Sequence, residues 1–523
     1  MDIQKGFFDK YYWYPVIITA ILCFGFTLTN YAIGVDDPTP QFIWYIDSKI
    51  LLSQGRWGYE LISPLVNISA FLPCWIDLIS VGIYLITGRI WANLFAEASG
   101  GRYNKISAII FSCLYISFPY LARIFIYMSA DLLSAFNMLF ASCGVWSIWK
   151  AFERDKGKKK NLFTALGCIV VGYGFYESVI IYFVCGTMIA LLLKDIFISV
   201  DKLKAIIIRV IVTGTIVCVG VFCSRLILKG FLRYYNQYSS QYVRRYFVYN
   251  LKTNIIGQIL QTIQELASAV FLREELVYSI LRLSVGFILL LTVCISLKRK
   301  NAILVIIGMG VVVSNFALIL GTGNLEIMFD IVQNKQRMLV TYGLFTSFSV
   351  SLIYSVVMEI MEVAVERNIL YRKIQKFLKY MIIALSFVLV LRQSREMVDI
   401  FLADYQRSVL DRQKAGYINY EVEKHDWKNK PVIYVGFTED YIATREKDPL
   451  SSYFHFFGQW TELENHNYIS FYMSGLGYIY PAGLREGMVE DAAESSTDQP
   501  AYPMDGYVTE YENYIVVKLG EGT

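Results

Sequence analysis

The sequence predicts a polytopic α-helical membrane protein of about 11 transmembrane helices, with an interfacial helix after the first and a small C-terminal α/β extracytoplasmic domain. Three observations support this fold class. Of the 523 residues, 55% are hydrophobic and only 18% are charged, which is too apolar for a soluble globular protein. Long apolar segments recur as far as about residue 391. The composition then becomes polar and charged up to residue 523.

The apolar segments match the length that a bilayer core requires of a helix. We expect the first crossing at 15–31, preceded by an aromatic belt at 11–14. We expect no cleavable signal peptide, because residues 28–38 offer no cleavage site and the apolar segment is long enough to span. Residues 41–53 show helical spacing with one polar face, which predicts a helix lying in the interface. The other expected crossings are 61–87, 106–121, 131–150, 162–177, 179–193, 205–228, 277–297, 302–321, 339–361 and 377–391.

The distribution of Lys and Arg predicts which loops face the cytoplasm. With the N-terminus inside, five expected cytoplasmic loops are basic, as the positive-inside rule requires. The expected external loop 229–276 disagrees, because it has five basic residues and no acidic one between Lys229 and Lys252. Either two crossings are misplaced, or this loop binds something anionic. Eleven crossings place the C-terminal domain, residues 392–523, outside, with strands at 430–436 and 514–518 and a helix at 397–420.

Several classes of chemistry find no support in the sequence. The nine cysteines lie in or beside apolar segments, which is typical of packing residues and not of disulfides. The three histidines, all C-terminal, match no metal motif. No nucleotide-binding phosphate loop, nucleophile elbow or dinucleotide fingerprint is present. We therefore expect no resident metal and no nucleic acid partner.

An acidic pair, Asp36 and Asp37, follows the first expected crossing. A carboxylate near the membrane surface suits general-base chemistry on a hydroxyl that attacks a lipid-linked donor. The alternatives are a solvated loop, or a helix cap before Pro38. Asp36 is the better candidate for the base, because Asp37 precedes the proline and is suited to the turn.

The segment Gly55-Arg56-Trp57-Gly58 lies just beyond the predicted interfacial helix. The guanidinium of Arg56 suits a phosphate, and the ring of Trp57 offers a face for a sugar. The alternative is interfacial anchoring by both side chains. Proximity to the acidic pair favours substrate binding.

Other charged residues fall in or beside the apolar segments, where ionisable groups are functional candidates. Asp77 lies inside the second expected crossing. Four more are expected near the outer face together with Tyr176, namely Arg123, Asp131, Glu177 and Arg337. In the external loop, Arg244 and Arg245 lie among tyrosines, which predicts either a lipid phosphate site or an interfacial anchor.

In their order, these motifs resemble the bacterial glucosyltransferase II family, integral-membrane enzymes of the C-type glycosyltransferase (GT-C) superfamily. The resemblance is carried by Asp36, Asp37, Gly55-Arg56-Trp57, Tyr176-Glu177-Ser178 and Arg337, over roughly residues 10–390. The family turn commonly reads Tyr-Gln-Ser, so Glu177 is a departure. The resemblance implies a transmembrane glycosyltransferase domain at 1–391, with a catalytic loop at 33–60, in a bacterial cytoplasmic membrane.

The resemblance also implies the reaction. A sugar, in first place glucose, passes with inversion from a polyprenyl phosphate to a cell-surface or lipid-linked polysaccharide on the outer face. Membrane lipid, the polyprenyl-phosphate sugar and the acceptor glycan are the expected partners, besides a flippase and a polyprenyl-phosphate sugar synthase. No cofactor is expected beyond the lipid-linked donor, although Asp36 and Asp37 are compatible with a divalent metal. The rival hypotheses are a transporter or flippase of a lipid-linked sugar and a non-catalytic scaffold of envelope assembly.

Overall fold

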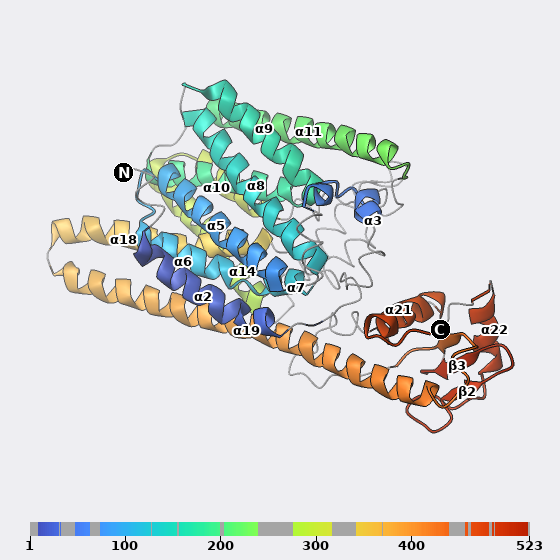
Figure 1. The fold of residues 1–523 in the computed structure, drawn as a ribbon. Coiled ribbons are helices and arrows are strands. Elements are labelled where there is room, and N and C mark those ends of the chain that lie inside the picture. The colour runs from blue at the N-terminus through green and yellow to red at the C-terminus, as the bar shows by residue number, and fades with distance from the viewer. Residues whose placement is uncertain are drawn as a thin grey trace.

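The computed structural model describes most of the chain, and only these parts are discussed. The described residues are 9–30, 32, 48–62, 74–126, 128–153, 156–198, 203–238, 276–315, 341–368, 370–438, 456–458, 462–480, 484–485 and 487–520. They form a bundle of long helices and a smaller unit around a sheet at the C-terminus (Figure 1).

Fourteen helical elements precede the first strand within the described residues. They are α2 (Lys10–Thr29), α3 (Ser48–Ser53), α5 (Cys74–Ala98), α6 (Lys105–Ile116), the 3₁₀ turn η1 (Pro119–Leu121), α7 (Ala122–Phe125), α8 (Met128–Glu153), α9 (Lys158–Phe175), α10 (Val179–Phe197), α11 (Leu203–Tyr234), α14 (Leu276–Arg299), α15 (Ile303–Asn315), α18 (Thr341–Arg367) and α19 (Tyr371–Val422).

The described helices confirm a polytopic helical membrane protein. Eight of them are long and apolar enough to cross a bilayer, and nine if the bent pair of α6 with η1–α7 is one span. The helices α9 and α15 occupy two further expected segments, but α9 begins with three lysines and α15 has only 13 residues. The number of eleven crossings therefore stays a prediction.

Polar contacts gather the basic loops at one end of the bundle, which we call the basic end. Arg102, after α5, forms an ion pair of 3.3 Å with Glu359 of α18 and donates to the carbonyl of Phe197 in α10. Lys194 of α10 and Arg209 of α11 lie on either side of the loop between these helices. Both contact Glu153 at the end of α8, at 2.8 and 2.9 Å. The loops that the positive-inside rule groups together thus also lie together in space.

Several helices differ from their predicted limits, among them α5 and α11. The second expected crossing, 61–87, is observed as α5 from Cys74 to Ala98. The helix continues past Arg89 because the guanidinium packs 4.0 Å from the centre of the Tyr12 ring of α2, so the charge is accommodated within the bundle. Similarly, α11 continues beyond residue 228 to Tyr234, because Leu228 and Leu232 bury their side chains in a cluster with Trp57.

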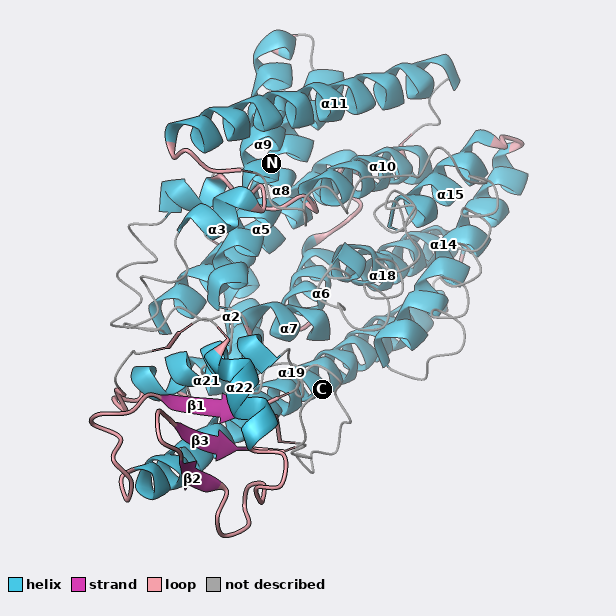
Figure 2. Ribbon diagram, turned by 90° about the vertical axis from the view of Figure 1, so that its right-hand side faces the viewer, coloured by secondary structure: helices cyan, strands magenta, loops and turns pink. Residues whose placement is uncertain are grey.

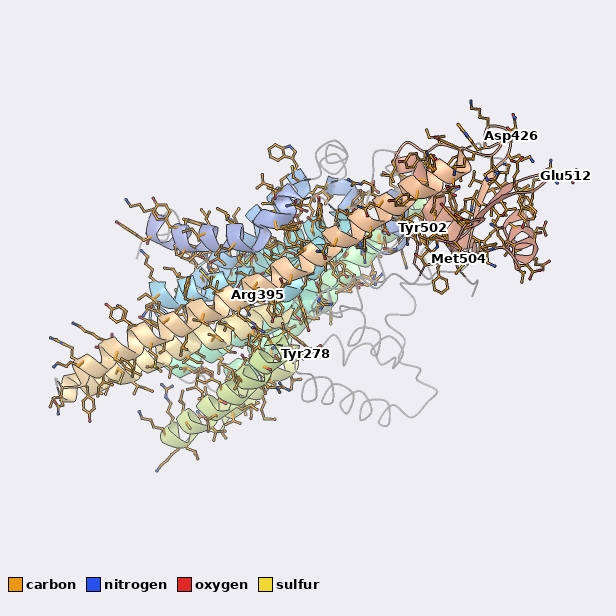
Figure 3. The ribbon with its side chains drawn as sticks, turned by 90° about the horizontal axis from the view of Figure 1, so that it is seen from below. Tyr278, Arg395, Asp426, Tyr502, Met504 and Glu512 are labelled. Atoms are coloured by element: carbon orange, nitrogen blue, oxygen red, sulfur yellow. The ribbon has the colours of Figure 1, made fainter. Side chains whose placement is uncertain are left out.

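The last crossing and the expected helix at 397–420 form one continuous helix. α19 has 52 residues, which corresponds to about 78 Å at 1.5 Å per residue. Its first half packs on α2 and α18, and its second half leads away from the bundle to the C-terminal unit (Figure 1, Figure 3). No proline or glycine interrupts residues 371–415, so the local sequence contains no helix breaker.

The C-terminal unit is built on a three-stranded sheet with the order β1-β3-β2 (Figure 2). β1 (Val432–Val435) pairs in parallel with β3 (Ile515–Lys518), and β2 (Val508–Glu510) pairs antiparallel with β3. The strands β1 and β3 lie where alternating and β-branched residues predict them. The helices α21 (Glu462–Gly475) and α22 (Met488–Ser495) both contact β1.

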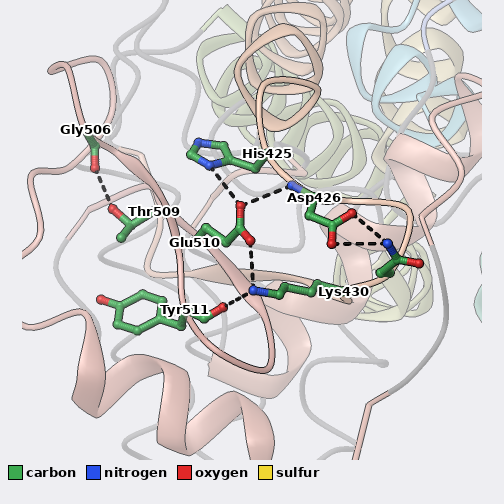
Figure 4. Close-up of polar contacts among 8 residues, drawn as sticks. His425, Asp426, Lys430, Gly506, Thr509, Glu510 and Tyr511 are labelled. Carbon is green, nitrogen blue, oxygen red and sulfur yellow. Dashed lines mark hydrogen bonds and ion pairs between the residues drawn. The ribbon is translucent and has the colours of Figure 1, made fainter.

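A polar cluster ties the entry of β1 to the end of β2 (Figure 4). Glu510 accepts a hydrogen bond of 2.8 Å from Lys430 and one of 3.1 Å from the backbone of Asp426, and lies 3.5 Å from His425. The hydrogen bond from Lys430 is the main cause that lowers the pKa of Glu510. The cluster is open to solvent, so it sets geometry more than stability.

Buried charges join α19 to the C-terminal unit. Arg407 is fully buried and donates to Asp404 at 2.8 Å and faces Asp411 at 3.5 Å. Asp411 in turn accepts from the backbone of Phe456, and Lys414 donates to the hydroxyl of Thr438, at 2.5 Å. Because breaking such a pair leaves an unpaired buried charge, this junction favours one orientation of the sheet on the helix.

His466 predicts a pH dependence of the C-terminal unit. Its Nδ1 accepts from the backbone of Tyr434 in β1 at 3.2 Å, and burial lowers its pKa from 6.5 to about 4. The unfolded chain binds this proton more readily, so the stabilisation is complete above pH 6.5 and is lost as the pH falls through 4. The loss amounts to about 3 kcal/mol.

Hydrogen exchange of β1 in the full chain, corrected for intrinsic rates, measures this effect. Protection should fall from pH 6.5 to 4.5 in the wild type and stay level in His466→Gln. His425→Gln, at the partly exposed ring beside Glu510, is the matched control. An equal loss of protection in His466→Gln would contradict the assignment.

Candidate functional site

The predicted site residues divide into those that the structure describes and those outside the described residues. Five of them lie outside the described residues, so their roles stay predictions: Asp36, Asp37, Arg244, Arg245 and Arg337. The described ones are Arg56, Trp57, Arg123, Asp131, Tyr176 and Glu177. All six lie at the end of the bundle opposite the basic end, which we call the site end: α2 and α9 end there, and α5 and α8 begin there.

The local sequence explains how Arg56 leaves the interfacial segment. α3 ends in a Schellman motif: Gly55 adopts a left-handed conformation with φ 94°, its N–H donates to Leu52, and the N–H of Arg56 donates to Leu51, both at 2.9 Å. Glycine suits this position because a side chain is strained there. Gly55 thereby turns the chain so that Arg56 and Trp57 follow α3 at once.

Trp57 is locked between α9 and α11. Its indole N–H donates to Ser224 of α11 at 2.8 Å, and its ring stacks on Phe231 at a centroid distance of 6.1 Å. On the other side, a Cβ placed on Gly174 of α9 would lie 2.2 Å from the indole. Only a glycine at 174 therefore admits this ring, which is 5% exposed.

Arg56 contacts the turn between α9 and α10. Its guanidinium carbon lies 5.0 Å from the centre of the Tyr176 ring, a cation–π contact. Both side chains are partly exposed. Gly58 also packs closely beside this turn, since a Cβ at position 58 would lie 2.8 Å from the ring of Phe175, the last residue of α9. The Gly-Arg-Trp-Gly segment and the Tyr-Glu-Ser turn thus form one surface, which we call the arginine–tyrosine site.

Asn137 of α8 forms hydrogen bonds with the turn between α9 and α10 from inside the bundle. Its amide N–H₂ donates to the carbonyls of Gly172, at 3.2 Å, and Tyr176, and its carbonyl accepts from the Ser178 hydroxyl at 3.2 Å. These bonds satisfy backbone and hydroxyl groups where α9 ends and α10 begins. The orientation of Tyr176 therefore depends on α8 as well as on its own turn.

Three further contacts border the arginine–tyrosine site. Arg225 of α11 donates to the hydroxyl of Tyr173 at 2.8 Å. Tyr235, just after α11, donates to Glu60 at 3.2 Å, and the Glu60 carboxylate raises the pKa of Tyr235. Glu177 lies close enough to Tyr173 to interact electrostatically. Charges of both signs therefore border the site.

Arg123 and Asp131 lie at the same end but make separate contacts, and Asp131 forms a second cluster with Asp77. Arg123 lies in α7, with its guanidinium 5.4 Å from the centre of the Tyr120 ring. Asp131 is fully buried in the first turn of α8, where its carboxyl group contacts Asp77 of α5. α8 connects the clusters, because Asp131 lies six residues before Asn137, about 9 Å along a helix.

The chemistry that the arginine–tyrosine site offers is anion and ring binding. A guanidinium backed by an aromatic ring presents its N–H fork to a phosphate or carboxylate. Within the described ranges, no group of three or more His, Cys, Asp or Glu is placed to hold a metal ion.

Three residues of this arrangement are absent from the predicted site. Asn137 is an amide inside an apolar segment, which is a signal that a polar contact between helices is present. Gly174 stands two residues before the turn, but nothing local shows that a tryptophan 117 positions earlier needs the space. Ser224 carries no local signal at all, because serine is common in membrane helices.

The helices and the arginine–tyrosine site define a multi-span membrane protein with a guanidinium held over an aromatic ring at one end of its bundle. The family model of glucosyl transferase GtrII matches residues 25–348, which is more than half of the chain. The chain therefore belongs to the GtrII glucosyl transferase family, and the resemblance found in the sequence is confirmed. It is accordingly a glycosyltransferase. Neither the curated proteins nor the solved structures contain a match.

Proposed function

We propose that this protein transfers glucose from a polyprenyl phosphate to a cell-surface or lipid-linked polysaccharide on the outer face of a bacterial cytoplasmic membrane. Besides the family, the observation that carries the proposal is the position of Arg56. Its guanidinium is held over Tyr176, beside the locked ring of Trp57, at one end of the helix bundle. A lipid-linked phosphate reaches an enzyme at this level, where the bilayer meets water.

The leaving group explains why an arginine is required there. When the bond between the sugar C1 and the phosphate oxygen breaks, the electron pair stays on polyprenyl phosphate, and negative charge builds up. A fixed guanidinium stabilises this charge more than it stabilises the bound donor, which lowers the barrier. Arg56 is the described candidate, and Arg244, Arg245 and Arg337 are the candidates outside the described residues.

The acceptor side of the reaction needs a base. An acceptor hydroxyl attacks C1 from the face opposite the phosphate, so the new C–O bond forms with inversion. The hydroxyl proton passes to the carboxylate of Asp36 or Asp37 and then to water. Both acids are a few residues after the end of α2 in the sequence, and α2 ends at the site end.

The loop charges support the outer face. The basic end holds the Lys- and Arg-rich loops, which under the positive-inside rule favours a cytoplasmic basic end and an external site end. A membrane-impermeant maleimide should label a single cysteine introduced at position 40 in intact cells, in a background without the nine native cysteines. Labelling only after the membrane is opened would place the site in the cytoplasm and overturn this part.

The donor is tested with purified full-length protein. With polyprenyl-phosphate glucose and an acceptor glycan it should release polyprenyl phosphate and glucosylate the glycan, whereas a nucleotide-activated glucose should not serve. Movement of the donor across a vesicle membrane without release would support a flippase instead. Neither release nor movement, in a correctly folded preparation, would support the scaffold.

A further inference from the structure

A pair of carboxyl groups is buried between α5 and α8 at the site end. Asp77 and Asp131 are 7% and 0% exposed, and their side chains contact each other. The sequence marks both residues but does not pair them, and the proposed reaction does not use Asp77. Two acids in contact inside a membrane bundle require a physical explanation, because their mutual repulsion and their desolvation both oppose ionisation.

The surrounding backbone nevertheless favours the ionised forms. Asp77 lies in the first turn of α5 and Asp131 in the first turn of α8, where the positive ends of the helix dipoles lie. One oxygen of Asp131 also accepts a hydrogen bond from the N–H of Leu132. Thr27 of α2 adds a hydroxyl, which donates to Asp77 at 3.4 Å.

Two oxygen atoms beside the pair lack hydrogen-bond partners. Ser80 is fully buried and lies close enough to interact with Asp131. Yet the Ser80 hydroxyl and Oδ2 of Asp131 each have no partner of hydrogen-bonding geometry among the described residues. Buried polar atoms are rarely left unpaired. A buried hydroxyl and a buried carboxylate oxygen that lie near each other, each without such a partner, are suited to bind one shared ligand.

The charge of that ligand follows from the missing counter-charge. In the described ranges, no Lys, Arg or His is among the groups that interact most strongly with the carboxyl group of Asp77 or Asp131. Two buried carboxylates without a counter-charge are strongly destabilising. One divalent cation offsets both charges, and carboxylate and hydroxyl oxygens are the donors preferred by hard cations.

We infer that Asp77 and Asp131, with the hydroxyls of Ser80 and Thr27, bind a divalent cation of the Mg²⁺, Mn²⁺ and Ca²⁺ class. The site departs from the expectation of no resident metal, because it consists of two carboxylates from different helices completed by hydroxyls. Such a cation joins the first turns of α5 and α8 to the end of α2, the helix that precedes Asp36 and Asp37. This inference does not depend on the proposed reaction.

Bound Mn²⁺ tests the inference without any activity measurement. The full-length protein in detergent, stripped with EDTA and titrated with Mn²⁺, should bind a single ion, as seen by electron paramagnetic resonance. Its thermal midpoint should rise with Mn²⁺ and fall again with EDTA. Asp77→Asn should abolish both responses, and Ser80→Ala, which keeps both carboxylates, should weaken Mn²⁺ binding by about tenfold.

The control is Glu362→Gln, an exposed carboxylate near the end of α18 and far from the site end. It should leave the bound Mn²⁺ unchanged. If Asp131→Asn does not fold, Asp77→Asn and Ser80→Ala still decide the outcome. Binding that survives in Asp77→Asn would overturn the inference. The inference would equally be overturned if the protein bound no Mn²⁺ and Asp77→Asn were as stable as the wild type in EDTA. That result would instead indicate that the two carboxyl groups share a proton.

Discussion

Asp36→Asn is expected to slow the release of polyprenyl phosphate from the sugar donor by about 10²–10⁴-fold, the range that general-base catalysis contributes. The amide keeps the shape of the side chain but no longer takes the proton of the attacking hydroxyl. Binding of the donor should change little, because the proposed mechanism assigns its phosphate to arginine and not to Asp36. The measurement is kcat and KM for release by the purified variant, with membrane expression compared in parallel.

Asp37→Asn and Asp399→Asn are the matched comparisons. Asp37→Asn makes the same change one residue later. It should reduce activity less than Asp36→Asn if the main role of Asp37 is in the turn before Pro38. Asp399 is a partly exposed acid of α19 that lies 3.7 Å from Arg395, so Asp399→Asn should keep full activity. Unchanged turnover in both Asp36→Asn and Asp37→Asn would refute the base assignment, whereas a larger loss in Asp37→Asn would reverse the roles of the two acids.

Gly174→Ala is expected to have the second largest effect, through the arginine–tyrosine site. The added methyl would lie 2.2 Å from the Trp57 indole, which has little freedom to retreat because Ser224 and Phe231 hold it. Overpacking of this kind costs about 1–3 kcal/mol. Displacing Trp57 also displaces Arg56, its neighbour in the chain, so activity should fall together with the thermal midpoint.

Gly167→Ala is the matched control on the same helix. A Cβ at Gly167 meets no atom within 4 Å, so alanine should be neutral or stabilise α9 by up to about 1 kcal/mol through its helix propensity. The double variant Gly174→Ala with Trp57→Phe should recover part of the lost stability, because the smaller ring makes room. The packing argument would be contradicted if Gly174→Ala and Gly167→Ala had the same stability and activity.

The sequence predicts those features that depend on neighbouring residues. Apolar length locates the helices, and β-branched residues locate β1 and β3. The second crossing was expected to end at residue 87, just before Arg89, whereas Tyr12 accommodates the guanidinium inside the bundle and the helix continues. The change to polar composition after residue 391 likewise suggested a boundary, but α19 continues through it.

The candidate site was predicted by type and only partly by arrangement. Arg56 and Tyr176 were expected in a common site and lie 5.0 Å apart, measured from the guanidinium carbon to the ring centre. Asp131 was expected with them but pairs with Asp77 in a separate cluster. Asn137, which fixes the turn at Tyr176, was not expected, since its partners lie 35 and 39 residues further along the chain.

The sequence by itself identified a membrane protein of the GtrII glucosyl transferase family and supplied the candidate residues for its chemistry, whose roles stay predictions. Hydropathy, caps and motifs are properties of short stretches, so they can be found without a structure. Only the tertiary structure decided that Trp57 needs the space above Gly174, that Asn137 holds the Tyr176 turn, and that Asp77 faces Asp131. These contacts depend on how distant helices pack against one another, and no local pattern records that packing.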